Sequence, residues 1–339
     1  MKKKIEVGII GAGRIGFHLE RDNKRVKPAS HFGMWLKNKK TDIKYISDKS
    51  EKSFFYAKKM VPHIEYFKDY KKLLAKNPQI ISIATWKDTH FRITKDAILK
   101  GIKVIVLEKP IANNIIQAKE IVELSKKKNV KLIINHRRRF DTEIIRLKKD
   151  LENGIIGKIL QVSSNYVYGI LTTGTHLIDT LRMLLSNITG DIVKVSGTIS
   201  LKKNFKPKDD INIDGVCIFK DGTKATIQNL DMKSYDNFDI HIYGTKGKIL
   251  ITDIGRKIIK YDVIKSPEHS GFTELSLSGK KISRGFARKQ FEVLGENALN
   301  CLINKKAEPL CGARDSFIDM LVIDKLIKSS KKNGKLLSI

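Results

Sequence analysis

The stretch IEVGIIGAGRIG, residues 5–16, decides the fold of this chain. It joins a β-branched apolar run to three glycines in the spacing GxGxxG, at Gly11, Gly13 and Gly16. A strand followed by this spacing is typical of a dinucleotide-binding turn, because the glycines permit a tight turn and a close approach of backbone amides to a pyrophosphate. We therefore expect the dinucleotide to contact Gly11, Gly13, Arg14, Ile15 and Gly16.

An acidic residue closes the next apolar run. Asp48 follows residues 43–47, where a carboxylate would accept hydrogen bonds from the adenosine ribose and repel the 2′-phosphate of NADP. The sequence thus favours NAD over NADP. Two alternatives remain open: Asp48, or a neighbouring serine, could simply cap the next helix, and Lys49 could partly accommodate a phosphate.

Apolar runs alternate with longer amphipathic stretches as far as residue 134. The runs lie at residues 5–10, 43–47, 80–84, 103–107 and 130–134, and helical patterns between them include residues 69–75, 91–100 and 115–127. This alternation is typical of parallel strands joined by crossover helices. Residues 1–134 are therefore predicted to form a doubly wound, parallel α/β domain of the Rossmann type.

The pattern changes in residues 135–339. Alternating runs at residues 193–201 and 238–242, together with the hairpin signal Asp221-Gly222, predict an α+β domain with a large, mostly antiparallel open sheet. A single long helical pattern, residues 286–331, closes the chain.

Composition limits the class of protein. A length of 339 residues with 41% apolar content predicts an ordered chain of two domains. No apolar run approaches the roughly 20 residues that a membrane span requires, and we read no signal peptide. Cys217, Cys301 and Cys311 lack the spacings of a metal site or a disulfide framework. We therefore expect a cytoplasmic protein with no membrane partner and no metal.

The net charge of +30 invites a nucleic-acid interpretation. Lysines dominate, however, and they are spread along the chain among acidic and apolar residues in helical periodicity, as on solvated helix faces. Only Arg137, Arg138 and Arg139 form a compact arginine cluster in the sequence. Because no nucleic-acid-binding module is visible, we expect no nucleic-acid partner.

An insertion separates the fingerprint from Asp48. More residues lie between them than the usual number of about 20, and we place the excess at residues 19–30. Such an insertion is either a solvated surface loop or a lid over cofactor and substrate. In a lid, Arg21 and Arg25 would contact an anionic group of the substrate, since a guanidinium can donate two parallel hydrogen bonds to it.

Two further motifs complete an ordered set. Glu108-Lys109-Pro110 follows the run at residues 103–107, and GTHLID occupies residues 174–179. With the fingerprint, NHRRRF at residues 135–140 and GTKG at residues 244–247, nearly the whole chain resembles the Gfo/Idh/MocA family of sugar and cyclitol dehydrogenases. The resemblance implies an NAD(P)-dependent dehydrogenase acting on CH-OH groups. It also implies a homodimer or homotetramer, because the sheet of the second domain often forms a subunit interface in this family.

By resemblance, Lys109 and His176 form the catalytic pair. Lys109 follows a parallel strand at the edge where ligands bind in open α/β sheets, and Pro110 restricts its backbone. The unperturbed pKa of a histidine side chain, about 6.5, suits His176 to the role of general base at neutral pH. Many family members carry an acid four residues before this histidine, where this chain has Thr172. That departure puts an Asp/His/Lys proton relay in doubt.

The remaining site residues are assigned by position. Thr85, Trp86 and Glu108 follow strands of the first domain and are expected at the cofactor, although Trp86 could instead pack on the sheet. The expected substrate contacts are Arg21, Arg25, Tyr166, Thr172 and Asp179. Two of these have alternatives: Tyr166 could pack within its sheet with Tyr168, and Asp179 could support the helix. The three clustered arginines could pair with acids or meet a substrate carboxylate or phosphate.

The sequence therefore predicts an NAD-dependent oxidoreductase of small carbohydrates. It would transfer a hydride between the nicotinamide ring and a secondary alcohol of a sugar, amino sugar, nucleotide sugar or cyclitol. In one form of this prediction, the substrate carries an anionic group. The alternative is a non-catalytic NAD-binding regulatory or scaffold protein of the same fold, for which Thr172 is the motivating departure.

Overall fold

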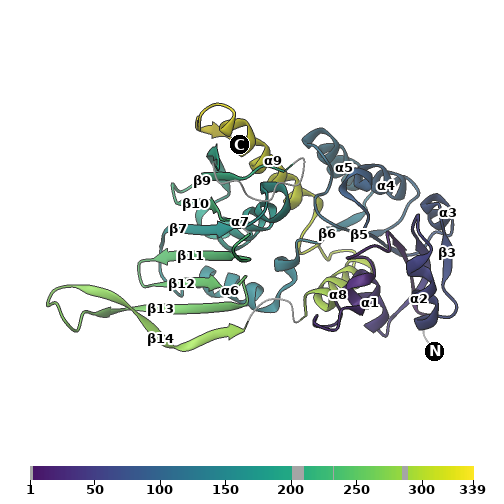
Figure 1. Cartoon of the computed structure of the whole chain (residues 1–339), viewed down its shortest axis with the longest axis horizontal. Coiled ribbons are helices and arrows are strands. Elements are labelled where there is room, and N and C mark those ends of the chain that lie inside the picture. Colours follow the sequence, from purple (N-terminus) through teal and green to yellow (C-terminus); the bar gives the residue numbers. More distant parts are fainter. Residues whose placement is uncertain (1–2, 201–209, 232, 285–288) are drawn as a thin grey trace. The chain divides into compact units, whose positions relative to one another are not determined.

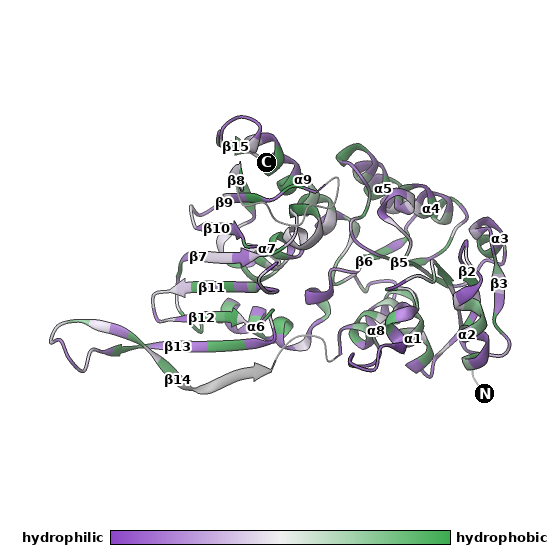
Figure 2. Cartoon of the chain, viewed as in Figure 1, coloured by the Kyte–Doolittle hydropathy of each residue, from purple (hydrophilic) through white to green (hydrophobic). Residues whose placement is uncertain are grey.

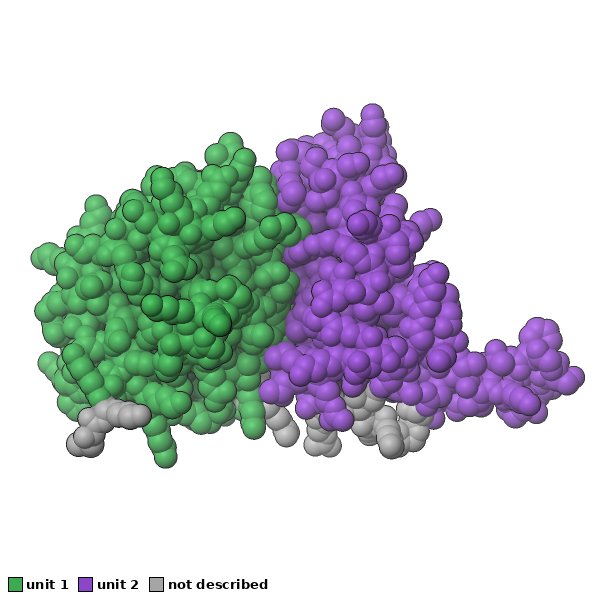
Figure 3. Space-filling model, turned by 180° about the vertical axis from the view of Figure 1, so that it is seen from behind, with its two compact units in different colours: residues 1–140, 288–318 green, residues 141–287, 319–339 purple. Residues whose placement is uncertain are grey.

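The chain folds into two compact units. The computed structural model describes residues 3–200, 210–231, 233–284 and 289–339 (Figure 1). One unit comprises Met1–Phe140 and Arg288–Ile318, and the other comprises Asp141–Ala287 and Asp319–Ile339 (Figure 3). Among the helices within the described ranges, none combines the length and the apolar character that a bilayer crossing demands.

The first unit is built on a parallel sheet. Its strand order is β3-β2-β1-β4-β5-β6, and every neighbouring pair is parallel. The strands are β1 (Ile5–Ile10), β2 (Thr41–Ser47), β3 (Glu65–Phe67), β4 (Ile80–Ile83), β5 (Val104–Leu107) and β6 (Lys131–Ile134). The predicted doubly wound α/β domain is confirmed, and the short β3 is an addition that the apolar pattern did not predict.

Helices cover this sheet, which explains why its strands read as continuous apolar runs. Every residue of β4 and β5 is buried. The helices are α1 (His31–Lys37), α2 (Lys52–Met60), α3 (Tyr70–Ala75), α4 (Lys87–Leu99), α5 (Ile115–Lys127) and α8 (Gln290–Ile303), with short turns η1 (His18–Arg21) and η2 (Arg137–Phe140). Side-chain caps set some of their starts: Asn114, for example, accepts a hydrogen bond from the amide of Gln117.

The helix that we expected directly after the fingerprint is interrupted. One turn follows the glycines, then η1 and a loop, and α1 begins only at His31. The amides of His31 and Phe32 nevertheless donate to the carbonyl oxygens of Ile15 and Gly16, at 3.1 and 2.9 Å. The insertion therefore interrupts the first helix, and the excess residues lie close to the predicted segment, residues 19–30.

The first unit also takes in residues from late in the chain. The helix α8 packs on α1 and beside β5, and the Ile134 amide donates to the Cys311 carbonyl at 2.9 Å. The division therefore differs from the predicted boundary after residue 134. Within the described residues, the helical pattern predicted over residues 286–331 consists of two helices, α8 and α9 (Ala313–Ser330). A non-helical stretch that contains Pro309 and Gly312 separates them.

The second unit is built on a nine-stranded sheet. Its order is β14-β13-β12-β11-β7-β10-β9-β8-β15, and among the described pairs only β7 and β10 run parallel. The strands are β7 (Ile159–Tyr166), β8 (Ile192–Ile199), β9 (Ile213–Phe219), β10 (Lys224–Asn229), β11 (Phe238–Gly244), β12 (Gly247–Thr252), β13 (Lys257–Lys265), β14 (Thr273–Arg284) and β15 (Leu337–Ser338). The mostly antiparallel sheet is confirmed, and the turn with Gly222 at φ +92° joins β9 to β10 as predicted.

The two faces of this sheet differ. Val162 and Ile242 oppose each other on the buried face, which carries α6 (Thr142–Glu152) and α7 (Thr175–Thr189) (Figures 1 and 2). On the other face, Tyr243, Lys248 and Tyr261 form one row of the register and stay partly exposed. The Lys248 ammonium lies 5.3 and 4.8 Å from the ring centroids of Tyr243 and Tyr261. We call this second surface the outer face.

The helix α7 has the predicted apolar stripe. Leu177, Leu181, Leu184 and Leu185 are fully buried. A π-helical turn, η3 (Ile170–Gly174), leads into α7 directly, and Gly190 ends the helix with φ +73°. The packing of this leucine stripe therefore holds the body of α7.

Candidate active site

The fingerprint loop has open space at its centre. Gly11 has φ +92°, and a Cβ atom there would lie 2.6 Å from the backbone of Ala84. At Gly16 a Cβ atom would lie 2.0 Å from the Gly11 carbonyl oxygen, whereas at Gly13 nothing lies within 4 Å. Gly13 and Arg14 are exposed. Close packing thus requires the first and third glycines, while the second leaves the room that a dinucleotide pyrophosphate needs.

Asp48 lies at the carboxyl end of β2 and holds the fingerprint loop. Its Oδ2 accepts a hydrogen bond from the Ala12 amide at 2.7 Å, and its Oδ1 accepts one from the Ser50 amide at 2.9 Å. It does not cap the next helix, because the residue before α2 is Glu51, which makes no side-chain cap. The capping alternative therefore does not describe this carboxylate.

Thr85 and Trp86 follow β4, the strand beside β1. The Thr85 hydroxyl accepts a hydrogen bond from the Thr89 hydroxyl at 2.7 Å. Trp86 is 85% exposed in the chain as described, so it does not pack on the sheet. An exposed indole at this strand end is available to a planar ligand.

Glu108 lies at the end of β5 within a polar cluster. Its Oε1 is 2.9 Å from His31 Nε2 and accepts a hydrogen bond from Asn135 Nδ2 at 2.6 Å. Burial raises the pKa of Glu108, but the His31 and Asn135 hydrogen bonds and the charge of Arg137 outweigh it, and the net pKa lies below its usual value. Glu108 therefore carries a largely buried carboxylate, 13% exposed, that the protein holds in its charged form.

Lys109 lies between two anchored neighbours. Glu108 on one side is fixed as described, and on the other side the Pro110 carbonyl oxygen lies 2.7 Å from His90 Nδ1. The second ring nitrogen of His90 lies 3.0 Å from the Thr85 carbonyl oxygen. The buried His90 thus ties the segment after β5 to the segment after β4.

These segments share one edge of the sheet. The fingerprint, Asp48, Thr85 and Lys109 follow β1, β2, β4 and β5, which are consecutive neighbours in the order β2-β1-β4-β5. The carboxyl ends of parallel strands are where open α/β sheets bind ligands.

The inserted loop is held by its own side chains. Glu20 Oε2 accepts hydrogen bonds from the Ala29 amide at 2.8 Å and from the Ser30 hydroxyl at 2.9 Å. Lys27 Nζ donates to the carbonyl oxygens of Leu19 and Asp22, at 2.9 and 2.8 Å. The loop is therefore an ordered part of the unit.

The two arginines of this loop have different surroundings. The Arg21 guanidinium lies 3.7 Å from the ring centroid of Tyr56 on α2. Arg25 Nε donates to Asp22 Oδ2 at 3.2 Å. Burial lowers the pKa of Arg137; the Glu108 carboxylate raises it, and Arg25 and Arg14 lower it further. Arg25 and Arg14 therefore share an electrostatic neighbourhood with Arg137.

In the second unit, His176 is the second residue of α7 and is partly buried. Its carbonyl oxygen accepts a hydrogen bond from the Thr180 hydroxyl at 2.6 Å. Thr172 lies one turn earlier in η3, and its amide donates to Asp210 Oδ2 at 2.7 Å. The sequence singled out Thr172 but not Asp210, which lies just before β9.

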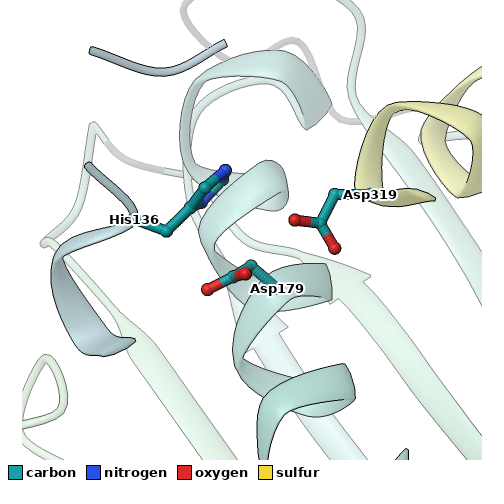
Figure 4. Close-up of side chains that lie close together, drawn as sticks. All are labelled: His136, Asp179 and Asp319. Carbon is teal, nitrogen blue, oxygen red and sulfur yellow. The ribbon is translucent and has the colours of Figure 1, made fainter. Parts of the chain in front are cut away.

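Asp179 lies deep in the fold. It is 1% exposed, and an oxygen of its carboxylate lies within 4.8 Å of one from Asp319 on α9 (Figure 4). Arg182 Nη1 donates to Asp319 Oδ1 at 2.5 Å, and its Nη2 donates to Asp191 at 2.8 Å. Burial lowers the pKa of Arg182, but the two carboxylates raise it above its ordinary value. Asp179 thus lies beside a buried network of ion pairs, and its role as a substrate contact or as a support of the helix stays a prediction.

Tyr166 fits the sheet-packing alternative. Its ring is fully buried, and its hydroxyl donates to the Ile213 carbonyl at 2.7 Å and accepts from the Ile213 amide at 3.0 Å. Burial raises its pKa far above the ordinary value. Because the hydroxyl is already hydrogen-bonded inside the sheet, we do not retain Tyr166 as a substrate contact.

Family models match both units. A model described as an oxidoreductase family with an NAD-binding Rossmann fold, GFO_IDH_MocA, matches residues 5–136. A second model, the GFO/IDH/MocA C-terminal domain, matches residues 144–250. The chain belongs to the Gfo/Idh/MocA family. Residues 5–136 form the family's NAD-binding Rossmann domain, and the protein is an oxidoreductase of this family.

Curated relatives of this Gfo/Idh/MocA protein are distant in sequence. The oxidoreductase YhhX of Escherichia coli is 25% identical over 229 residues, which span 62% of this chain and 64% of that protein. The myo-inositol 2-dehydrogenase of Thermotoga maritima is 25% identical over 268 residues, which span 74% of this chain and 76% of that enzyme.

Solved structures share the whole fold. The WlbA dehydrogenase of Bordetella pertussis, in complex with NADH and UDP-GlcNAcA, is 16% identical, has a TM-score of 0.78, and covers 100% of this chain and 98% of its own. A levoglucosan dehydrogenase, in complex with NADH and levoglucosan, is 16% identical, has a TM-score of 0.79, and covers 99% and 100%. At these identities the likeness shows the fold alone.

Proposed function

We propose that this Gfo/Idh/MocA protein oxidises a secondary alcohol of a sugar, amino sugar, nucleotide sugar or cyclitol. When bound, NAD supplies the carbon that accepts the hydride. The residues that would hold NAD are the fingerprint Gly11, Gly13, Arg14, Ile15 and Gly16, with Asp48, Thr85 and Trp86. The open space at Gly13 and the exposed indole of Trp86 support this assignment.

The anchored Lys109 segment is the observation that carries the proposal. Hydrogen bonds fix Glu108 on one side of the lysine, and His90 contacts Pro110 on the other. An ammonium group held in this way at the ligand-binding edge can donate a hydrogen bond to the substrate oxygen. Glu108 would act through Lys109, as its support, and not as the cofactor contact first expected.

His176 would remove the hydroxyl proton. A neutral imidazole accepts that proton as the C–H bond transfers its hydride, so the alcohol becomes a carbonyl and the histidine becomes an imidazolium. Lys109 would stabilise the negative charge that develops on the oxygen. The myo-inositol 2-dehydrogenase among the curated relatives supports alcohols of cyclic polyols as the substrate class.

The test is NADH formation with a panel of cyclitols, sugars and nucleotide sugars. We expect Lys109→Ala and His176→Ala each to lower turnover by about 10² to 10⁴-fold while NADH binding persists. The exposed Lys103, at the amino end of β5, is the matched control, and Lys103→Ala should keep full turnover. Unchanged turnover in both site variants would remove the pair from the mechanism.

A different result would point to another function. NAD binding without NADH formation from any member of the panel would overturn the catalytic proposal. It would favour the non-catalytic, NAD-binding alternative.

A further inference from the structure

Asp210 joins a loop before β9 to the segment that carries His176. Its side chain is buried, with 5% exposure. Oδ1 accepts a hydrogen bond from the Leu171 amide and Oδ2 one from the Thr172 amide, each at 2.7 Å. Beside them, the Ile170 amide donates to the Ile211 carbonyl at 2.8 Å. Three successive amides of η3 thus bond to residues 210 and 211.

The carboxylate and the amides suit each other electrostatically. The first amides of a helical segment lack acceptors within it, and a negative charge at this end is favourable. Each carboxylate oxygen of Asp210 accepts a hydrogen bond from one of two adjacent amides, so two hydrogen bonds restrain the backbone of the turn.

The chain also leaves space for this contact at the residue before η3. A Cβ atom on Gly169 would lie 2.0 Å from the carboxyl carbon of Asp210 and 2.3 Å from each oxygen. Since atoms cannot approach that closely, any larger residue at position 169 would displace the carboxylate. The position of the Asp210 carboxylate therefore requires glycine at position 169.

The fixed turn continues without a break into the helix of the proposed base. Thr172 and His176 are four residues apart, so they lie on one side of the same helical segment. The direction in which the imidazole leaves the segment depends on the backbone of this first turn. Elsewhere α7 is held by its buried leucine stripe, which does not reach η3.

We propose that Asp210 is a positioning residue, which fixes η3 and thereby the orientation of His176. This inference rests on the proposed function, because His176 is the proposed base. Asp210 would touch neither substrate nor cofactor in this role. Its removal should impair the chemical step more than the binding of either ligand.

The experiment compares three variants. Asp210→Ala removes both acceptors, and Asp210→Asn keeps one carbonyl oxygen. Asp141→Ala is the matched control, because Asp141 is equally buried, with 4% exposure, and accepts two amide hydrogen bonds at the start of α6. All three variants lie in the second unit, so NADH affinity should not change.

Two readouts need no substrate. Hydrogen exchange of peptides covering residues 169–177 should quicken in Asp210→Ala, less in Asp210→Asn, and not in Asp141→Ala. The rate of carbethoxylation of His176, measured by peptide mass spectrometry, should change most in Asp210→Ala, less in Asp210→Asn, and not in Asp141→Ala. Unchanged exchange and unchanged His176 reactivity in Asp210→Ala would overturn the proposal.

A third readout uses turnover. Asp210→Ala should lower kcat by about 10 to 100-fold with little change in KM, and Asp210→Asn should recover part of the loss. An equal loss of kcat in Asp141→Ala would overturn the proposal, because the effect would then be general destabilisation. If the unmutated protein forms no NADH, the proposed function fails by that result, while the two substrate-free readouts still decide the role of Asp210.

Discussion

Glu108 is a carboxylate whose charged form is supported by hydrogen bonds and by nearby positive charge. His31 and Asn135 contact the same oxygen, Oε1, and the net effect is a lowered pKa. A carboxyl group whose pKa is lower in the folded than in the unfolded state stabilises the fold above its unfolded pKa. This contribution disappears as the pH falls through the folded pKa.

The first prediction concerns this stability. Glu108→Gln should lower the melting temperature at pH 7, because the charged hydrogen bonds are lost. The gap to the unmutated protein should close as the pH falls below about 4, where an unfolded glutamate becomes protonated. Thermal unfolding followed by circular dichroism across this range measures the gap, and a constant gap would contradict the pKa direction.

The second prediction concerns Asp48 and the choice of cofactor. Because Asp48 also accepts a hydrogen bond from the Ala12 amide, Asp48→Ala would disturb the loop as well as remove the charge. Asp48→Asn is therefore the sharper variant, since its amide oxygen can keep that bond. We expect NADH to bind at least about tenfold more tightly than NADPH, a difference of about 1.4 kcal/mol, and Asp48→Asn to narrow the gap. Calorimetry that found NADPH binding more tightly to the unmutated protein would reverse the assignment.

The inserted loop, residues 19–30, interrupts the helix that follows the fingerprint. The two arginines of this loop make different contacts. Arg21 stacks on Tyr56 of α2, while Arg25 shares the electrostatic neighbourhood of Arg14 and Arg137. An anionic substrate group would therefore meet Arg25 before Arg21. The original expectation treated the two arginines alike.

The third prediction follows from this difference. With an anionic substrate such as a sugar acid or a nucleotide sugar, Arg25→Ala should raise KM by about tenfold, the loss expected for one charged hydrogen-bonding partner. The affinity for NAD should change less, and Arg21→Ala serves as the control, with a smaller effect on KM. An uncharged preferred substrate, or an unchanged KM in Arg25→Ala, would show that the loop is only surface.

The strands of the first unit could be predicted from sequence for a physical reason. A strand buried on both faces must be apolar throughout, so residues 80–83 and 104–107 are visible as short continuous runs. The three residues of β3 are too few to show a pattern, and the broken first helix depends on residues that return to it from beyond the insertion. The end of α8 at Ile303 was not predicted, because the helical periodicity continues on both sides of residues 304–312.

The candidate site could be predicted where residues follow strands. Asp48 could be proposed because it directly follows an apolar run, and Lys109 because it lies in the motif Glu108-Lys109-Pro110 after such a run. His31 and Asp210 could not, because their contacts join positions far apart in the chain, at Glu108 and at Thr172. A single polar residue in a loop has no periodicity that would mark its partner.

The outer face of the nine-stranded sheet exposes aromatic and aliphatic side chains. Its row of Tyr243, Lys248 and Tyr261 is partly exposed, and Leu277, opposite Tyr261 in the register, is 65% exposed. Aromatic and aliphatic side chains in such a row are typical of the centre of a protein interface. We therefore retain the homodimer or homotetramer as a proposal.

The fourth prediction tests this surface. Tyr261→Glu would bury a charge at the interface and should shift the protein to a smaller species in sedimentation velocity. Ile116 on α5, which is 81% exposed and lies in the first unit, provides the control variant Ile116→Glu. A monomeric unmutated protein would refute the oligomer directly, and an unchanged Tyr261→Glu species would exclude the outer face.

Hydride transfer from a secondary alcohol to NAD can be measured by following the transferred hydrogen itself. The protein is incubated with NAD and with polyols deuterated at their carbinol carbons, beginning with myo-inositol, and the NADH formed is analysed by mass spectrometry. We expect NADH that carries one deuterium, and we expect Lys109→Ala and His176→Ala to form strongly reduced amounts of it. NADH without deuterium, or tight NAD binding with no NADH from any polyol or nucleotide sugar, would contradict this expectation.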